Sequence, residues 1–429
     1  MKNPALKDAF RSLYRNEDWW AVWLGFALLG ISSVHLLLWV PRIGKWSFDL
    51  SASIGTSGFP YLVILGLFLL FVTSIPVVAT KSSLKGYLLG FPLIFFLSLM
   101  SLLIANQDHI NYLGLEYVLW ALLLGLFISN VIGLPERLKS SIKTELFIKT
   151  GLVLLGAEIL FGSLLAAGAA GLFEITVSLF IVWYFCYYLA VKLGLSKSFA
   201  CIMASATSIC GVSAAIATGG AVKGDPKEVS YTVSLVLLFS IPLLVIMPYI
   251  AKAIGMQDAI VGAWIGGTID TTPAVVAAGA LYSDKAMKVA SIIKMSQNVL
   301  IGIVAFILAV YWALKVERKE NEKPRPIEIW YRFPKFILGF IIASILSSFL
   351  LIPMFGNAAN AIINQAKNMR SWFFAMAFVC IGLNTNFREV VKIGGGKPLF
   401  VFTMATLLDI LLSLTSAYIF FSGILFPSI

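Results

Sequence analysis

Apolar residues occur along this chain in long runs that are separated by short polar segments. A run of about 18 residues lets a helix cross a hydrocarbon core roughly 30 Å thick. The runs predict about thirteen transmembrane helices, at 19–40, 60–79, 86–105, 117–133, 146–165, 168–191, 198–220, 229–251, 257–282, 286–313, 334–353, 371–387 and 398–421. The pattern therefore predicts an all-α, polytopic membrane helix bundle.

Composition agrees with a chain that has the bilayer as its main solvent. Of 429 residues, 59% are apolar and 12% are charged, which is about half the charged share of an average soluble domain. The first apolar run follows a basic tail and has no small-residue cleavage site, so it is expected to be a helix and not a signal peptide. No soluble catalytic domain is expected.

The positive charges predict the topology of the chain. Most of the 32 Lys and Arg residues fall on the same side as the N-terminal tail, including those in a predicted cytoplasmic loop at 315–335. Fewer fall on the other side, among them Lys367 and Arg370. Because cytoplasmic loops of membrane proteins are enriched in Lys and Arg, the N-terminus is expected in the cytoplasm of a bacterial cell with the chain in its inner membrane.

Two of the apolar segments contain unusually many small, polar and helix-breaking residues, at 205–213 and 266–273. Unwound backbone is tolerated at membrane depth where protein or a water-filled cavity satisfies its amides, and transporters use such breaks to bind substrates. Pro273 fits the first turn of a helix that the preceding residues cap. Breaks are therefore expected near Cys210 and Gly211 and between Asp270 and Thr272, with a half-helix beginning at Pro273.

Close helix packing is the alternative explanation for these small residues, since Gly, Ala and Ser let helix backbones approach each other. The two segments also show a weak similarity when 209–219 is laid on 269–279. Inverted repeats are expected from this similarity, but their limits cannot be placed.

Several short motifs occur in order along the chain: Gly133-Leu-Pro-Glu136, Ser208-Ile-Cys-Gly211 with Ser213-Ala-Ala, Val275-Val-Ala-Ala-Gly279, Lys294-Met295, and residues 376–383. With these motifs the chain, from about Asn130 to the C-terminus, resembles the YeiH-type family of bacterial membrane proteins, usually called sulfate exporters. The resemblance implies inverted repeats, crossed broken helices and an elevator-like alternating-access mechanism. It also implies sulfate as a substrate.

Four positions depart from the pattern of that family. Asp270 and Thr271 stand where the family usually has His followed by an acidic residue, Ala274 stands where it has Gln, and Gln297 stands where Arg is common. Losing two cations and gaining an Asp makes the local site less positive. A less charged anion than sulfate, or coupling to a cation, becomes more plausible.

The predicted domain organisation follows from the breaks and the resemblance. Residues 1–115 are expected to form peripheral N-terminal transmembrane helices. Residues 116–314 are expected to form a transporter core with both breaks, and 315–335 the cytoplasmic loop. Residues 336–429 would add C-terminal helices of the core and scaffold.

Ionisable side chains within the apolar segments are candidate functional groups, because a charge at mid-membrane costs several kcal/mol unless it is paired or hydrated. Asp270 and Glu158 are candidate ion-coupling residues that could bind Na⁺ or a proton. Asp270 could instead cap the half-helix at Pro273, and Glu158 could lie at the interface. Lys294 could neutralise Asp270 or attract an anion. Asp409 is expected to pair across helices.

Polar side chains and backbone near the two breaks could bind an oxyanion without a formal charge. Half-helix N-termini would add positive potential there, although interhelical hydrogen bonding is an equal alternative for these residues. The candidate substrate-binding residues are Ser208, Cys210, Gly211, Ser213, Thr271, Thr272, Lys294, Gln297 and Asn298.

The leading hypothesis is a secondary transporter of a small anion, either sulfate-like, a sulfonate or an organic anion. The alternative is a Na⁺ or proton antiporter that uses Asp270. An enzyme is not expected, because His35 and His109 are the only histidines and no catalytic triad, metal-ligand set or P-loop is present. The expected partners are a small anionic substrate, membrane lipid and, by analogy, a second copy of the chain. No nucleic acid, metal or organic cofactor is expected.

Overall fold

The computed structural model describes residues 16–34, 36–49, 51–54, 58–112, 117–312, 334–385 and 396–422, and these residues form helices without a named strand. Seven of the described helices are long and apolar enough to cross a membrane, at Gly58–Ala79, Leu84–Ala105, Ala167–Lys192, Pro226–Ala253, Asp284–Tyr311, Lys335–Phe355 and Lys397–Phe421. The prediction of an all-α, multi-pass membrane protein is confirmed. The count of about thirteen spans, the inverted repeats and the elevator mechanism stay predictions.

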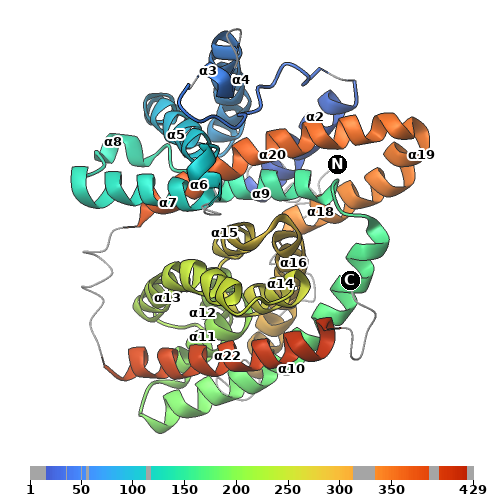
Figure 1. Cartoon of the computed structure of the whole chain (residues 1–429). Coiled ribbons are helices and arrows are strands. Elements are labelled where there is room, and N and C mark those ends of the chain that lie inside the picture. Colours follow the sequence, from blue (N-terminus) through green and yellow to red (C-terminus); the bar gives the residue numbers. More distant parts are fainter. Residues whose placement is uncertain are drawn as a thin grey trace, which may run out of the picture. The chain divides into compact units, whose positions relative to one another are not determined.

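The chain divides into two compact units that alternate along the sequence (Figure 1). Unit 1 contains residues 1–161 and 335–387, and unit 2 contains residues 162–334 and 388–429. These borders cut across the segment 116–314 that was predicted as the transporter core. Most of the predicted cytoplasmic loop at 315–335 lies outside the described residues.

Unit 1 is built around α20, which packs against α7, α9 and α5. Its buried aromatic side chains include Trp372, Phe374 and Phe378. The helices of unit 1 are α2 (Glu17–Ser33), α3 (Ser51–Ile54), α4 (Gly58–Ala79), α5 (Leu84–Ala105), α6 (Asp108–Tyr112), α7 (Tyr117–Phe127), η1 (Ile128–Ile132), α8 (Glu136–Lys139), α9 (Thr144–Gly156), α18 (Lys335–Leu346), η4 (Ser347–Leu351), α19 (Ile352–Phe355) and α20 (Asn357–Asn384).

Two glycines allow α7 and α20 to cross with their backbones in contact. A Cβ atom on Gly125 would lie 2.5 Å from the carbonyl oxygen of Val379 and 2.9 Å from the Cα atom of Gly382. Because a methyl group does not fit at these distances, both positions need glycine. Gly382 belongs to the 376–383 motif of the sequence, which therefore has a packing role.

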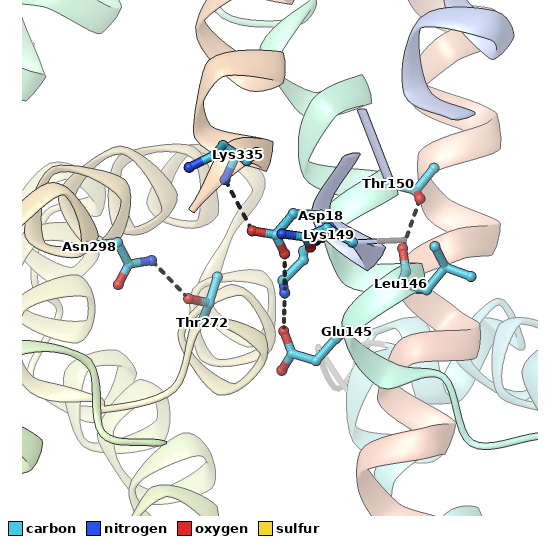
Figure 2. Close-up of polar contacts among 9 residues, drawn as sticks. Asp18, Glu145, Leu146, Lys149, Thr150, Thr272, Asn298 and Lys335 are labelled. Atoms are coloured by element: carbon cyan, nitrogen blue, oxygen red, sulfur yellow. Dashed lines mark hydrogen bonds and ion pairs between the residues drawn. The ribbon is translucent and has the colours of Figure 1, made fainter. Parts of the chain in front are cut away.

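The first helix is part of unit 1 through a network of charges. The Lys149 Nζ atom lies 2.7 Å from Asp18 Oδ1 and 3.1 Å from Glu145 Oε2, and the Lys335 backbone N–H donates to Asp18 Oδ2 at 3.0 Å (Figure 2). Asp18 thereby caps the N-terminus of α18, which has free amides of its own. Helix α2 also packs against α9 and α18. Whether residues 1–115 are peripheral to transport stays a prediction.

Three predicted helix borders differ from the structure. Helix α2 ends at Ser33 instead of residue 40, and the run at 146–165 is interrupted between α9 and α10. Helix α20 begins at Asn357 instead of residue 371, so Lys367 and Arg370 lie inside a helix and not in an outer loop. Hydropathy missed this part of α20 because its side chains are polar. They are tolerated in the helix because they bond to other parts of the protein, as when Asn368 Nδ2 donates to the Val40 carbonyl at 3.1 Å.

Unit 2 is centred on α14, which packs against α16 on one side and α22 on another. Helix α15 packs against α16 and α13, and α12 packs against α16. The helices of this unit are α10 (Phe161–Lys192), which begins at the border, then α11 (Lys197–Ser205), η2 (Ala206–Cys210), α12 (Val212–Ala221), α13 (Pro226–Ala253), α14 (Asp258–Thr268), α15 (Thr272–Tyr282), α16 (Asp284–Tyr311) and α22 (Lys397–Phe421).

Some of the small residues in unit 2 serve close packing, as the alternative explanation predicted. Cβ atoms on Gly262 and Gly266 would lie 2.7 Å from the Ala286 carbonyl and 2.8 Å from the Ala290 carbonyl, respectively. The two glycines are one turn apart on α14, so they form a smooth strip against α16. This strip brings the end of α14 close to the polar face of α16.

Candidate functional site

Both predicted helix breaks are confirmed. The first lies at Gly211, which has φ +55° and separates η2 from α12. The second lies at 269–271, between α14 and α15. Helix α15 begins at Thr272 with Pro273 in its first turn, which confirms the predicted half-helix to within one residue.

The two breaks meet inside unit 2. A Cβ atom on Gly211 would lie 2.9 Å from the Cβ atom of Asp270 and 2.5 Å from Val236 Cγ1. Glycine is required here for two reasons, since the positive φ disfavours other residues and the neighbouring break leaves no room for a side chain. The 205–213 and 266–273 segments therefore form one crossing point.

Four helix ends come together at this crossing. Helices α12 and α15 begin here, and the side chain at neither N-cap position makes a capping hydrogen bond. The first amides of a helix have no partner within it and give its N-terminus a partial positive charge. Helices η2 and α14 end here, so carbonyl groups with a partial negative charge lie at the same place.

Two side chains of α16 bond to the carbonyl ends. Lys294 is 1% exposed, and its Nζ atom donates to the Ile209 carbonyl at 3.0 Å and to Gln297 Oε1 at 2.7 Å. Gln297 Nε2 donates to the Ser208 carbonyl at 3.2 Å and to the Gly267 carbonyl at 3.4 Å. Lys294 and Gln297 thus compensate the negative ends of both broken helices.

Asn298 of α16 contacts the beginning of α15. Its Nδ2 atom donates to Thr272 Oγ1 at 3.2 Å (Figure 2). The Asn298 Oδ1 atom and the hydroxyl of Thr268 are buried, and neither has a hydrogen-bond partner among the described residues. Buried polar atoms usually have partners, so these two oxygens are available to a ligand or to water.

Asp270 is the charged residue at the second break. It is 5% exposed, and within the described part of the chain its carboxylate forms no ion pair or hydrogen bond. It interacts electrostatically with Lys294 without direct contact. Its position one residue before the N-cap of α15 places a negative charge at the positive end of that helix, which is favourable.

The structure brings together most of the predicted site residues, but their roles stay predictions. Ser208 and Cys210 are buried in η2, and the Ser208 hydroxyl donates to the Ala204 carbonyl of the preceding helix α11 at 2.7 Å. Thr271 and Thr272 are half-buried at the second break, and Ser213 is exposed on α12.

Glu158 lies in a different environment from the other candidates. It follows α9 in unit 1, where its Oε1 atom is 2.8 Å from Nε of Arg370, with side-chain exposures of 2% and 4%. The Arg370 guanidinium also lies over the ring of Phe374, 5.4 Å from its centroid. Arg370 was not predicted as a partner, because the sequence placed it in a loop.

Asp409, which was expected to pair across helices, is a second acidic residue near the crossing. It is 4% exposed on α22 and interacts electrostatically with Lys294 and Asp270. The expected ion pair across helices is not found among the described residues. The available signal was a lone Asp between apolar residues at 407–412.

Comparisons with known proteins identify the family. The family described as conserved hypothetical protein 698 matches residues 89–402. A UPF0324 membrane protein of Rhodopirellula baltica is 42% identical over 392 residues, covering 88% of this chain and 71% of that protein. A second, of Nitratidesulfovibrio vulgaris, is 40% identical over 80% of this chain and 61% of its own length. A third, of Nitrosomonas europaea, is 31% identical with 94% of each chain covered. The chain therefore belongs to this family of membrane proteins, the YeiH-type family that its motifs resemble.

Proposed function

We propose that this membrane protein is a secondary transporter of a small anion, which binds at the crossing of the two broken helices. The observation that supports the proposal most is the meeting of two half-helix N-termini, α12 and α15, without side-chain caps. Their free amides can donate to an oxyanion, and the helix dipoles attract negative charge. A membrane helix with a purely structural role would not need such a break.

The neighbouring side chains suit a small oxyanion such as sulfate, a sulfonate or a carboxylate. Thr271 and Thr272 are half-buried at the beginning of α15 and provide hydroxyl donors. Lys294 contributes positive potential, although its Nζ atom is already bonded to the Ile209 carbonyl and Gln297. Substrate recognition therefore rests on backbone amides and hydroxyls, with Lys294 holding the broken helices together.

Asp270 gives the proposed transporter a coupling group. A carboxylate next to an anion site opposes anion binding unless it takes up a proton or a cation. Protonation of Asp270 would therefore favour anion binding, and transport of the two together would follow. Alternating access in the inner membrane, with the N-terminus in the cytoplasm, belongs to this proposal, which requires no enzymatic step and no organic cofactor.

A Na⁺ or proton antiporter is the second candidate, and one observation favours it. Within the described part of the chain, Asp270 and Asp409 are both buried near one cation, Lys294. With all three groups ionised, the negative charges exceed the positive one. Such a site could bind a cation without any anion.

Uptake by proteoliposomes tests the two candidates. Labelled sulfate, a small sulfonate and a small carboxylate would each be offered with and without gradients of pH and Na⁺. The expected result is anion uptake that a pH or Na⁺ gradient increases. We expect Lys294→Ala to abolish uptake and Asp270→Asn to abolish its response to the gradient.

Asp225→Asn is the matched control for these variants. Asp225 caps α13 through a hydrogen bond from the Lys227 N–H at 2.8 Å, and Asn is an equally good cap. This variant should transport like the wild type. Absence of anion uptake, together with Na⁺ or proton exchange that depends on Asp270, would replace the anion proposal with the antiporter.

A further inference from the structure

Asp409 lies on the buried face of α22, which is the face that packs against α14. The Trp264 Nε1 atom of α14 donates to the carbonyl of Ile410 at 3.0 Å, so the two helices are bonded next to Asp409. Trp264 is one turn before Thr268, where α14 ends and leads into Asp270. Asp409 is therefore held beside the last turn of the helix that precedes the second break.

Helix α14 packs against two helices that contain charged side chains of opposite sign. On one side Gly266 packs against α16, which contains Lys294. On another side α22 contains Asp409. Asp409 interacts electrostatically with both Lys294 and Asp270, yet among the described residues it forms no ion pair.

The hydrogen bonding around Asp409 is incomplete. Among the described residues, its carboxylate accepts a side-chain hydrogen bond from the Ser413 hydroxyl of its own helix, at 3.5 Å, which is the outer limit for a hydrogen bond. Thr406 lies one turn before Asp409 on the same buried face of α22. The Thr406 hydroxyl is buried and has no hydrogen-bond partner within the described residues, so it is available to bond to the carboxyl group.

The balance of charge determines what Asp409 can do. Lys294 can neutralise one carboxylate, but Asp270 and Asp409 are two. A buried carboxylate without a counter-charge is strongly disfavoured, and it becomes neutral by binding a proton. Carboxyl groups that interact in this way gain and lose protons as a pair.

We propose that Asp409 is a second proton-binding carboxyl of the transport site, which shares one exchangeable proton with Asp270. The inference rests on the proposed function and adds the identity of the coupling ion, a proton. The described titratable groups that face this site are Asp270 at the second break, Lys294 on α16 and the buried thiol of Cys186 on α10, which interacts electrostatically with Asp270. Helix η2, which also packs against α22, contributes the buried thiol of Cys210.

Infrared difference spectroscopy on the purified protein tests the proton site without any substrate. A step from acidic to alkaline pH should remove the carbonyl band of a protonated carboxyl group in the wild type. Asp409→Asn should abolish that band, because the remaining Asp270 is then balanced by Lys294. Asp270→Asn should abolish it for the corresponding reason, and Asp225→Asn should leave it unchanged.

Asp409→Glu is a second variant that tests the proposal if Asp409→Asn does not fold. It keeps the carboxyl group, so the band should remain with a shifted midpoint pH. A band that persists unchanged in Asp409→Asn, or that is absent from the wild type at every pH, would overturn the proposal.

Transport then separates this inference from the proposed function. In proteoliposomes, Asp409→Asn should lose the stimulation of sulfate uptake by a pH gradient but keep the exchange of internal for external sulfate. Loss of both activities in a folded variant would make Asp409 a structural residue and contradict the proposal. If the wild type transports no anion, the proposed function fails, and the infrared result still decides whether Asp409 binds a proton.

Discussion

The two units use buried and half-buried charges in opposite ways. In unit 1, Lys149 lies 2.7 Å from Asp18 and Arg370 lies 2.8 Å from Glu158, so each cation touches a carboxylate. In unit 2, Lys294 bonds to a carbonyl and an amide oxygen, and it touches neither Asp270 nor Asp409.

This difference distinguishes charges that stabilise the fold from charges that can take part in transport under the proposed function. Asp18 uses both carboxylate oxygens, one for Lys149 and one for the N-terminus of α18 (Figure 2). Separating such groups would leave charges unpaired at a cost of several kcal/mol. Asp270 and Asp409 of unit 2 form no such ion pair among the described residues. Under the proposed function, unit 1 is therefore the better candidate for the rigid part of the transporter.

Breaking the Glu158–Arg370 pair should have the largest effect on stability. Arg370→Gln would leave a buried carboxylate without its cation, and the expected loss is about 3–5 kcal/mol. Thermal unfolding in detergent measures it. The double variant Glu158→Gln with Arg370→Gln should recover part of the loss, because no buried charge then remains unpaired. A wild-type unfolding temperature for Arg370→Gln would show that the pair has no structural role.

Lys294→Gln should have the second-largest effect on stability. The Ile209 carbonyl would lose its donor, which costs about 1–3 kcal/mol, and Asp270 and Asp409 would lose their shared cation. Adding Asp409→Asn should restore part of the stability, since it removes one of the two uncompensated carboxylates. A double-mutant cycle of unfolding measurements gives this coupling. Strictly additive effects would mean that Lys294 and Asp409 do not interact.

Gly211→Ala tests the crossing of the broken helices. The positive φ costs about 1–3 kcal/mol for a residue with a Cβ atom, and that atom would displace Asp270. Lower stability and loss of sulfate uptake are both expected. Gly220→Ala on α12 is the matched control, because a Cβ atom there meets nothing within 4 Å, and it should be neutral or slightly stabilising. Equal behaviour of the two variants would contradict the crossing.

Glu145→Gln should have the smallest effect. Its carboxylate is 53% exposed and bonds to Lys149 only from the rim of the network, and exposed pairs contribute about 0–1 kcal/mol. Asp18→Asn should cost more than Glu145→Gln in the same unfolding assay, since it weakens two contacts. The reverse order would show that Asp18 does not organise the network.

The helix breaks could be predicted from the sequence because they depend on local chemistry. Gly211 and Pro273 have conformational preferences that act within a few residues, and the hydroxyl-rich segments around them are unfavourable in contact with lipid. Lys294 and Gln297 were also identified, since a polar side chain within an apolar run is visible in the sequence whatever its contacts in the fold.

Contacts between distant segments could not be predicted in the same way. The partner of Glu158 is 212 positions away at Arg370 by the residue numbers, and no local pattern joins them. The first half of α20 is too polar to be recognised as a membrane helix by hydropathy, and its contacts with distant segments cannot be read from the sequence. Asp409 was identified as a charge, but its place beside the break depends on how α22 packs against α14.

The cap that Asp18 places on α18 also has a consequence for how the protein is made. Lys335 follows Asp18 by 317 positions, and at about 5–20 residues per second a ribosome needs roughly 15–60 s to cover that distance. Lys149 follows Asp18 by 131 positions and is synthesised much earlier. During synthesis, both residues of the Asp18–Lys149 pair are therefore present before α18 is made, so this pair can form first.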